Sequence, residues 1–492
     1  MREAGFRTGA FVGAFVLDAS FGLEQGFETY SGVASGVASA DFLRPSDLQR
    51  PAAEVNALAL RWIEALEGER FFAWIHYYDP HDPYAPPEDP SVRLQGLGYD
   101  REISYVDHCF GELVGHLERK GLLDRTMLVV AGDHGESLGS HGERKHGIFL
   151  YEPAVHVPFF VRAPGLVPLG RRYETPVSLV DVAPTVLSLL GLPPLQGIDG
   201  RSLWTPSGQL VAEQADRLVY GETRMPRIEL GWSELAMIRD GRFKYVRAPR
   251  PELYDLSHDP TETTNLIETN REVASDLSEA LDLTLSKSKT GAHSEAAKVL
   301  SPEELAKLQS LGYLQGSVGS ATGAASGSLP DPKDRIAEAS RLDEAEEHLE
   351  RGELDAAIGK YEEVSRENRG NHSALQGRAR ALLRKGDLEK AEEAALAALA
   401  AAGADPQSPP PLADNARALL ATTLSLRGRR AEAEKALRST ATLSPTSVLM
   451  AAAKNQDDAK AIVQSAIRRL PADPWTWAAM LEFSRRVGDR EG

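Results

Sequence analysis

Cysteine is almost absent from this sequence, which contains Cys109 and no second cysteine. An intrachain disulfide is therefore excluded. The surrounding segment "YVDHCFGELV" places Cys109 on the apolar side of a predicted helix. We expect it to be a small buried hydrophobic residue rather than a reactive thiol.

Long apolar runs and an excess of positive charge are also missing. No apolar run is long enough to cross a membrane. The stretch from Phe11 to Leu17 is short and contains Gly13, which favours a core strand over a signal peptide. The net charge of −17 argues against a nucleic-acid partner, which would require a basic face. It does not exclude a small anionic substrate, because a site can be locally positive on an acidic protein.

At 492 residues the chain is too long for one ordinary hydrophobic core, so two or more domains are expected. Residues 1–205 alternate predicted strands with predicted helices. This order favours an α/β sheet whose ligands bind beyond the carboxyl ends of the strands. The predicted strands are "TGAFVGAFVL", "RFFAWIHYY", "TMLVVAG" and "VPFFVRAPG". The third is uncharged and rich in strand-forming residues, which is typical of a central parallel strand.

The predicted secondary structure and the composition change after residue 205. Residues 215–270 contain short predicted strands joined by tight turns, including the hairpin signal "RDGR", and they predict a small antiparallel subdomain. Residues 315–330 are rich in glycine, serine and alanine, as in a flexible linker.

From residue 331 onward the sequence is helical and repetitive. Gly352 and Gly386 stand 34 residues apart, and Ala357 and Ala391 have the same separation. This period predicts tetratricopeptide repeats. A generic alanine-rich helical bundle is the weaker alternative.

The apolar segment "TMLVVAG" leads directly into Asp133 and His134. A carboxylate and a neutral imidazole can together occupy two positions on one divalent cation. The alternative is a capping aspartate and a surface histidine. The loop after "FFAWIHYY" carries His81, and the loop after Asp133 carries Lys145 and His146. If the two strands are parallel neighbours, these loops meet, and a metal and nitrogen donors can bind a tetrahedral anion.

Several stretches of residues 1–270 resemble successive blocks of the sulfatases, a family of the alkaline-phosphatase superfamily. The blocks occur in the family's order and spacing. With the segment at 310–316 and the repeat tail, they resemble a bacterial sulfatase subgroup that carries tetratricopeptide repeats. The matching blocks are "FFAWIHYYDPHDPYAPP", "AGDHGESLGSHGE", "HGIFLYEPAVHVPFFVRAPG", "VSLVDVAPTVLSLLGLP" and "ELYDLSHDPTETTNL".

The resemblance implies one divalent metal ion at the strand ends, with Ca²⁺ as the first expectation and Zn²⁺ or Mn²⁺ as alternatives. Asp133 and His134 match the family's later ligand pair, and His81 matches its substrate-side histidine. His146 lies near the place of a substrate-binding lysine or histidine, and Lys145 competes for that role. The implied substrate is an anionic sulfate ester, or a phosphate ester in related enzymes.

Three neighbouring polar residues are predicted to be structural. Asp79 and Asp82 are expected to shape the "DPHDP" turn rather than bind metal. His141 is expected to support the loop or to contact a ligand from behind.

The sequence departs from the family at its nucleophile. The family places two aspartates on its first strand and follows them with a Cys/Ser-x-Pro-x-Arg motif, whereas Cys109 is followed here by "FGEL". Without a nucleophile a covalent intermediate cannot form. We therefore expect an N-terminally truncated sulfatase-like chain that is inactive, or nearly so, by itself.

Two other functions stay open. The loop "GESLGSHGERKHG" also resembles phosphodiester and phosphonate hydrolases and phosphoethanolamine transferases of the same superfamily. Alternatively the chain is an interaction protein, whose repeat array binds a protein or peptide in a concave groove.

The predicted architecture has three parts. An incomplete, mostly parallel sulfatase-like α/β domain spans 1–285, with its antiparallel subdomain at about 215–270. A helix and a Gly/Ser-rich linker follow at 286–330, and an all-α tetratricopeptide-repeat solenoid spans 331–492. The resembled family is usually exported, but no leader is visible in the sequence, so the compartment is left open. The substrate's identity is also unreadable.

Overall fold

A computed structural model of the chain describes residues 1–33, 49–82, 84–87, 96, 98–211, 217–290, 329–404 and 410–437. These residues form two compact units. Unit 1 consists of Met1–Asp133 and Val157–Arg217, and unit 2 consists of His134–His156 and the described residues from Leu218 onward. No helix within these described ranges is both long and apolar enough to span a bilayer.

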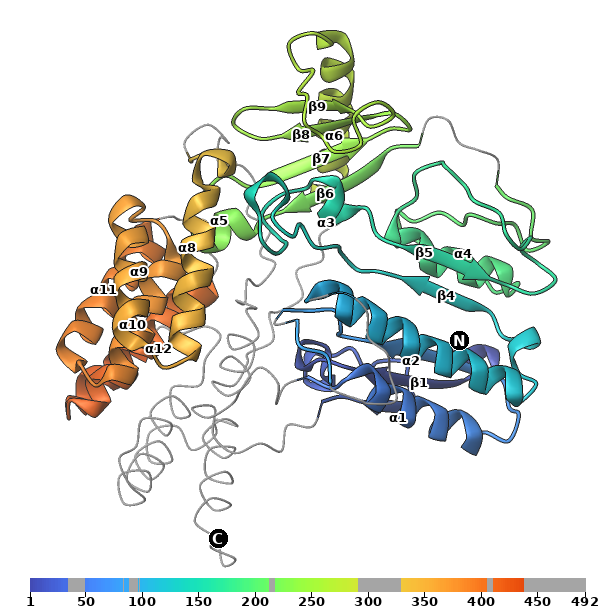
Figure 1. Ribbon diagram of the computed structural model, residues 1–492, viewed down its shortest axis with the longest axis horizontal. Coiled ribbons are helices and arrows are strands. Elements are labelled where there is room, and N and C mark those ends of the chain that lie inside the picture. Colours follow the sequence, from blue (N-terminus) through green and yellow to red (C-terminus); the bar gives the residue numbers. More distant parts are fainter. Residues whose placement is uncertain are drawn as a thin grey trace, which may run out of the picture. The chain divides into compact units, whose positions relative to one another are not determined.

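Unit 1 contains a parallel sheet with the strand order β2-β1-β3. Strand β1 of this sheet is labelled in Figure 1. Its strands are β1 (Arg7–Val12), β2 (Thr29–Ser31) and β3 (Phe71–His76). Helix α1 (Ala52–Ala65) packs on β1 and β3, and α2 (Tyr99–Arg119) packs on α1. Cys109 is fully buried against α1, which confirms that it is a core residue.

The other two strands of unit 1 form a separate pair. Strand β4 (Leu128–Ala131) is antiparallel to β5 (Phe159–Arg162), and neither is hydrogen-bonded to β1–β3 within the described ranges. The prediction that "TMLVVAG" is a central strand of a mostly parallel sheet is therefore wrong. An uncharged apolar run indicates that a strand is apolar on both faces, but it does not encode the direction of the neighbouring strand. Helix α4 (Val182–Leu189) follows this pair.

Unit 2 contains an antiparallel sheet in the order β6-β7-β8-β9. Its strands are β6 (Val219–Thr223), β7 (Leu235–Arg239), β8 (Phe243–Arg247) and β9 (Glu252–Asp255). The predicted antiparallel subdomain is confirmed, and the "RDGR" segment turns the chain between β7 and β8. Helix α6 (Arg271–Thr290) packs on β7 and β8. Two short helices, α3 (Glu152–Val155) and α5 (Met225–Leu230), belong to the same unit.

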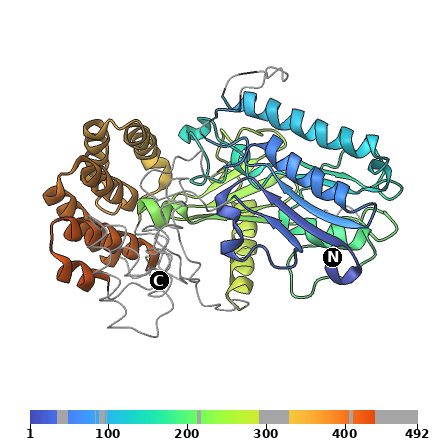
Figure 2. The ribbon, with the colours of Figure 1, turned by 90° about the horizontal axis from the view of Figure 1, so that it is seen from below.

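The helical part of unit 2 is an array in which each helix packs on the next along the chain (Figure 2). The helices are α8 (Pro332–Glu350), α9 (Leu354–Glu367), α10 (His372–Lys385), α11 (Leu388–Ala404), α12 (Pro410–Leu426) and α13 (Arg430–Leu437). Gly352, Gly386 and Gly428 turn alternate helix pairs with φ angles of 77°, 85° and 81°. Ala357 and Ala391 are fully buried. The predicted helices beyond residue 437 lie outside the described residues.

Helix α8 packs against the antiparallel part of unit 2. Its apolar residues Ile336, Ala339 and Leu342 contact the hydrophobic cluster that includes the buried Trp232. At its start, Asp334 receives two hydrogen bonds of 2.8 Å from the Arg250 guanidinium. Most of the predicted linker at 286–330 lies outside the described residues.

Short 3₁₀ turns complete the two units. They cover Arg2–Ala4, Phe15–Leu17, Ala19–Phe21, Leu123–Arg125, Ser140–Gly142 and Leu179–Asp181.

Candidate functional site

The loop from His134 to Tyr151 in unit 2 carries three of the predicted site residues. Its path is fixed by backbone hydrogen bonds of 2.8 Å from Gly135 N to Ala154 O and from Ser137 N to Lys145 O. A side chain at position 135 would place its Cβ 2.1 Å from the carbonyl oxygen of Pro153. Glycine at this position therefore allows the backbone of the loop to approach the backbone of α3 closely.

A buried carboxylate ties the two arms of this loop together. Glu143 is only 2% exposed. It accepts hydrogen bonds from the backbone N–H groups of Ile148 (2.7 Å) and Phe149 (3.3 Å) and from the Ser137 hydroxyl (2.9 Å). Burial raises the pKa of Glu143, and these donors oppose that rise. Ser137 follows Glu136, and Ile148 lies two residues beyond His146. By accepting hydrogen bonds from Ser137 and Ile148, the Glu143 carboxylate determines where the side chains of Glu136 and His146 lie.

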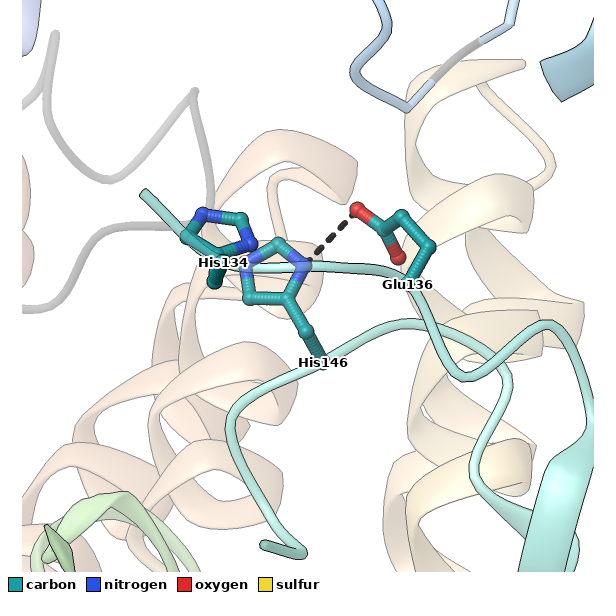
Figure 3. Close-up of side chains that lie close together, drawn as sticks. All are labelled: His134, Glu136 and His146. Carbon is teal, nitrogen blue, oxygen red and sulfur yellow. Dashed lines mark hydrogen bonds and ion pairs between the residues drawn. The ribbon is translucent and has the colours of Figure 1, made fainter. Parts of the chain in front are cut away.

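His134, Glu136 and His146 form a compact group at the start of the loop (Figure 3). One potential ligand atom from each residue lies within 4.8 Å of the others. The ring centroids of His134 and His146 are 3.9 Å apart, and Nδ1 of His146 lies 2.8 Å from Oε1 of Glu136. The Glu136 side chain is 4% exposed. This group has the donor atoms and spacing to hold a metal ion.

Lys145 and its neighbour Arg144 pair with helix α8. Nζ of Lys145 lies 3.6 Å from Oδ1 of Asp343, and the Arg144 guanidinium lies 3.3 Å from Oε1 of Glu347. His146 differs from Lys145 because it contacts His134 and Glu136.

His81 lies in unit 1, in the loop after β3. Its ring stacks on Tyr78 at 4.2 Å, and its Nε2 lies 3.0 Å from the Tyr78 hydroxyl. Its Nδ1 lies 2.7 Å from the carbonyl oxygen of Asp82, which can only accept a hydrogen bond. The backbone N–H of His81 donates to Glu102 at 2.9 Å. Both the ring and the backbone of His81 are therefore held in a defined orientation.

The carboxyl ends of β3 and β4 carry His76 and Asp133, both in unit 1. Burial lowers the pKa of His76, and the charge of Asp133 acts in the opposite direction. The two side chains are therefore within electrostatic range, although no hydrogen bond joins strands β3 and β4 in the described part of the chain.

Asp79 contacts the start of α1. Its Oδ2 accepts a hydrogen bond of 3.0 Å from the Ala52 N–H. The predicted role of Asp79 in the "DPHDP" turn stays a prediction.

Three residues near the predicted ones were missed by sequence reasoning, namely His76, Glu102 and Glu136. Glu136 stands two positions after His134, and this short spacing is the signal that could have found it. His76 and Glu102 offered no comparable signal, because they lie on a strand and a helix. His141, predicted to support the loop, stacks on Tyr151 with ring centroids 3.6 Å apart.

Two family models match the chain. Residues 1–192 match the model described as sulfatase, and residues 139–289 match the model described as N-sulphoglucosamine sulphohydrolase, C-terminal. Residues 1–289 are sulfatase-like. The match covers unit 1, the site-bearing loop and the antiparallel sheet of unit 2.

Named proteins are also similar to part of the chain. The sequence is 35% identical to choline-sulfatase of Rhizobium meliloti (strain 1021) over 191 residues, which is 37% of this chain and 35% of that protein. It is 29% identical to arylsulfatase K of Bos taurus over 192 residues, which is 36% of this chain and 34% of that protein. The chain thus spans about a third of the length of these relatives.

A solved structure is also similar to the chain. It is the structure of BT4656 in complex with its substrate D-glucosamine-2-N,6-O-disulfate, with a TM-score of 0.47 and 19% sequence identity. The similarity covers 59% of this chain and 81% of that one.

The side-chain donor atoms of the sulfatase-like region can be compared with the ligands that different metal ions prefer. Ca²⁺ takes about 6–8 oxygen ligands, whereas imidazole nitrogen suits Zn²⁺ and other transition ions. His134 and His146 each offer an imidazole, and Glu136 offers a carboxylate. The group in unit 2 therefore offers nitrogen and oxygen donors to a divalent ion.

Proposed function

We propose that the sulfatase-like region acts in the metal-dependent hydrolysis of sulfate esters. The observation that carries this proposal is the continuous match to sulfatase models over residues 1–289, which includes Asp133 and His134. A divalent ion supplies positive charge for the sulfate oxygens when it is bound.

The proposed roles follow the residue types. Asp133 and His134 are the proposed ion ligands. His81 is the proposed substrate-side group, because its protonated ring can give the Nε2 proton to a leaving oxygen while Nδ1 stays bonded to the Asp82 carbonyl. Tyr78 and Glu102, which contact His81, would orient it. His146 and Lys145 are the proposed substrate-binding candidates, and the pairing of Lys145 with Asp343 supports His146.

The turnover rate that we expect depends on whether the chain supplies a nucleophile. No Cys/Ser-x-Pro-x-Arg motif occurs in the 492 residues. We propose that the ion and the histidines bind and polarise an ester, while turnover by this chain alone is very slow.

A second candidate function is hydrolysis of phosphodiesters or phosphonate monoesters. The specific observation in its favour is the pair of imidazoles in the group His134, Glu136 and His146. Nitrogen-rich donor sets suit Zn²⁺, which polarises phosphoryl oxygens well.

For the helical region we propose tetratricopeptide repeats that bind a protein or peptide. The 34-residue separation of Gly352 and Gly386, the positive φ angles of both, and the buried Ala357 and Ala391 support this proposal. Stacked helix pairs of this kind present an extended concave surface.

The test is an activity assay on the full chain with matched variants. Choline sulfate and p-nitrophenyl sulfate would be compared with bis(p-nitrophenyl) phosphate and a phosphonate monoester, each with Ca²⁺, Mn²⁺ or Zn²⁺ added. Asp133→Ala should abolish the turnover observed, whereas Asp124→Ala should not, because Asp124 is exposed and pairs with Arg162. Turnover of phosphorus esters alone favours the second function. Turnover that survives Asp133→Ala would refute both.

A further inference from the structure

The segment that carries His146 packs against α8, the first helix of the helical array. A Cβ at Gly142 would lie 3.2 Å from Cγ2 of Ile336, so the backbone of the loop approaches α8 closely. Ile336 also packs on the hydrophobic cluster that contains the buried residues 148–151. One apolar side chain of α8 therefore contacts the loop both before and after His146.

Two ion pairs add to this apolar contact. The Arg144 guanidinium lies 3.3 Å from Oε1 of Glu347, and Nζ of Lys145 lies 3.6 Å from Oδ1 of Asp343. The two acidic residues lie on one face of α8, because they are four positions apart. Partly exposed ion pairs contribute little free energy. Their effect here is alignment, since they attach the two residues before His146 to one helix face.

A second series of contacts connects the helical array to the residue after His146. A Cβ at Gly147 would lie 3.6 Å from Cε of Met225, the first residue of α5. At the other end of α5, the carbonyl oxygen of Leu230 accepts a hydrogen bond of 2.8 Å from Nδ2 of Asn368, which follows α9. Helix α5 thus links the array to the segment that follows His146.

The start of α8 is anchored beside strand β9 by buried carboxylates. Asp331 is 6% exposed and accepts a hydrogen bond of 3.0 Å from the backbone N–H of Arg250. Nζ of Lys333 lies 3.6 Å from the carboxylate of Glu252, which also accepts a hydrogen bond of 3.1 Å from the hydroxyl of Tyr151 in the loop. Displacing α8 would leave these buried groups unpaired, which costs free energy. Helix α8 is therefore a firm support for the loop.

We propose that α8 of the helical array holds His146 beside His134, where the two ring centroids are 3.9 Å apart (Figure 3). Ile336 and Glu347 are then positioning residues for His146. The inference rests on the proposed function, in which His146 is a substrate-binding candidate. It makes the helical array a part of the sulfatase-like site rather than a separate binding module. A partner that displaces α8 would therefore change how the site binds an ester.

The test observes the two imidazoles directly in the full chain, with isotopically labelled histidine. The ring signals of His134 and His146 are assigned by substituting each residue in turn. A nuclear Overhauser cross-peak between the two rings reports their placement. Hydrogen exchange at the Ile148 amide, which donates to Glu143 at 2.7 Å, reports opening of the loop. Neither measurement requires turnover of an ester.

The variants separate the apolar contact from the charged one. Ile336→Ala removes the apolar contact, and Glu347→Lys places a positive charge opposite Arg144. Ile358→Ala is the matched control for packing, because Ile358 packs within the array. Glu362→Lys is the matched control for charge, because Glu362 forms ion pairs inside the array. The double variant Arg144→Glu/Glu347→Lys restores the pair with its charges exchanged, and circular dichroism checks that each variant is folded.

We expect Ile336→Ala and Glu347→Lys to shift the ring signals of His146 and to weaken its cross-peak with His134. Ile336→Ala should also speed exchange at the Ile148 amide at least about 10-fold. The double variant should recover the wild-type signals, and both controls should retain them.

Wild-type signals in a folded test variant would overturn the positioning role of its residue, and equal changes in the controls would overturn the whole proposal. A double variant that fails to recover the signals would exclude Glu347. If Ile336→Ala does not fold, Glu347→Lys and the double variant decide the question.

The outcome is separable from the proposed function. Where an ester is turned over, both test variants should raise KM and leave kcat unchanged, because they weaken ester binding. If the His146 signals depend on α8 but no ester is hydrolysed, the positioning role stands and the proposed function fails. If an ester is hydrolysed with dependence on Asp133 while both test variants keep the wild-type signals, the function stands and the positioning role fails.

Discussion

Glu102 makes the stability of unit 1 depend on pH in an unusual direction. Its side chain is buried, and its Oε2 accepts the backbone N–H of His81 at 2.9 Å. Burial, with smaller contributions from Asp79 and Asp82, raises the pKa of Glu102 to about 7, from an ordinary value of 4.5. Between pH 4.5 and about 7 the folded state therefore holds a proton that the unfolded state has released.

The sign and the size of the effect follow from this difference. Stability falls as pH rises wherever the folded state binds more protons. The contribution of Glu102 is fully present below pH 4.5, is lost as pH rises through about 7, and is constant above that. The gap between 4.5 and about 7, at about 1.36 kcal/mol for each pH unit, gives at most about 3 kcal/mol.

Glu102→Gln removes the titrating group and keeps an oxygen that can accept from His81. We expect the variant to lose up to about 3 kcal/mol of the pH dependence between pH 4.5 and 8, which is about 6–12 °C in melting temperature for a unit of this size. Differential scanning calorimetry of the full chain at several pH values measures it. Glu112→Gln is the matched control, because Glu112 lies on the same helix with its side chain 57% exposed. Identical pH profiles for wild type and Glu102→Gln would refute the reasoning.

Three further predictions concern unit 2. Glu143→Ala should destabilise the site-bearing loop by about 2–4 kcal/mol, because it leaves the Ile148 amide unsatisfied; hydrogen exchange at that amide checks this, and unchanged exchange contradicts it. Lys244→Met should cost about 3–5 kcal/mol in urea denaturation, because Nζ of the buried Lys244 lies 2.8 Å from the carboxylate of the equally buried Glu262. The control Lys385→Met removes an exposed ion pair with Asp355 and should cost less than about 1 kcal/mol. Equal losses of unfolding free energy for the two substitutions would contradict the larger contribution expected from the buried pair. Gly135→Ala should lower the melting temperature, because its Cβ would lie 2.1 Å from a backbone oxygen; a wild-type melting temperature would show that the loop can open there.

The sequence by itself determined several of the local elements. Helix periodicity predicted α2 and its buried Cys109, and the "RDGR" turn predicted the β7–β8 hairpin. The region from residue 331 onward was predicted to be helical, and it contains helices α8 to α13. These features depend on a few adjacent residues, whose backbone preferences and side-chain spacing act over one or two turns of chain.

The candidate site was predicted only in part. Asp133 and His134 were identifiable because they directly follow an apolar strand, a position that is readable from sequence. Their proposed role as ion ligands stays a prediction. The pairing of His146 with Glu136 was not identifiable, because the two are ten residues apart and meet only through the fold of the loop. The hydrogen bonds of Glu143 produce that fold.

Only the tertiary structure decided which surfaces meet. The apolar residues of β4 are compatible with a parallel or an antiparallel neighbour, and β5 is antiparallel to β4. The same holds for α8, whose apolar face packs on the antiparallel part of unit 2 and whose Asp343 pairs with Lys145. The physical reason is that hydrophobic burial is non-directional. A sequence pattern indicates which face of an element is buried, whereas the rest of the chain determines what that face packs against.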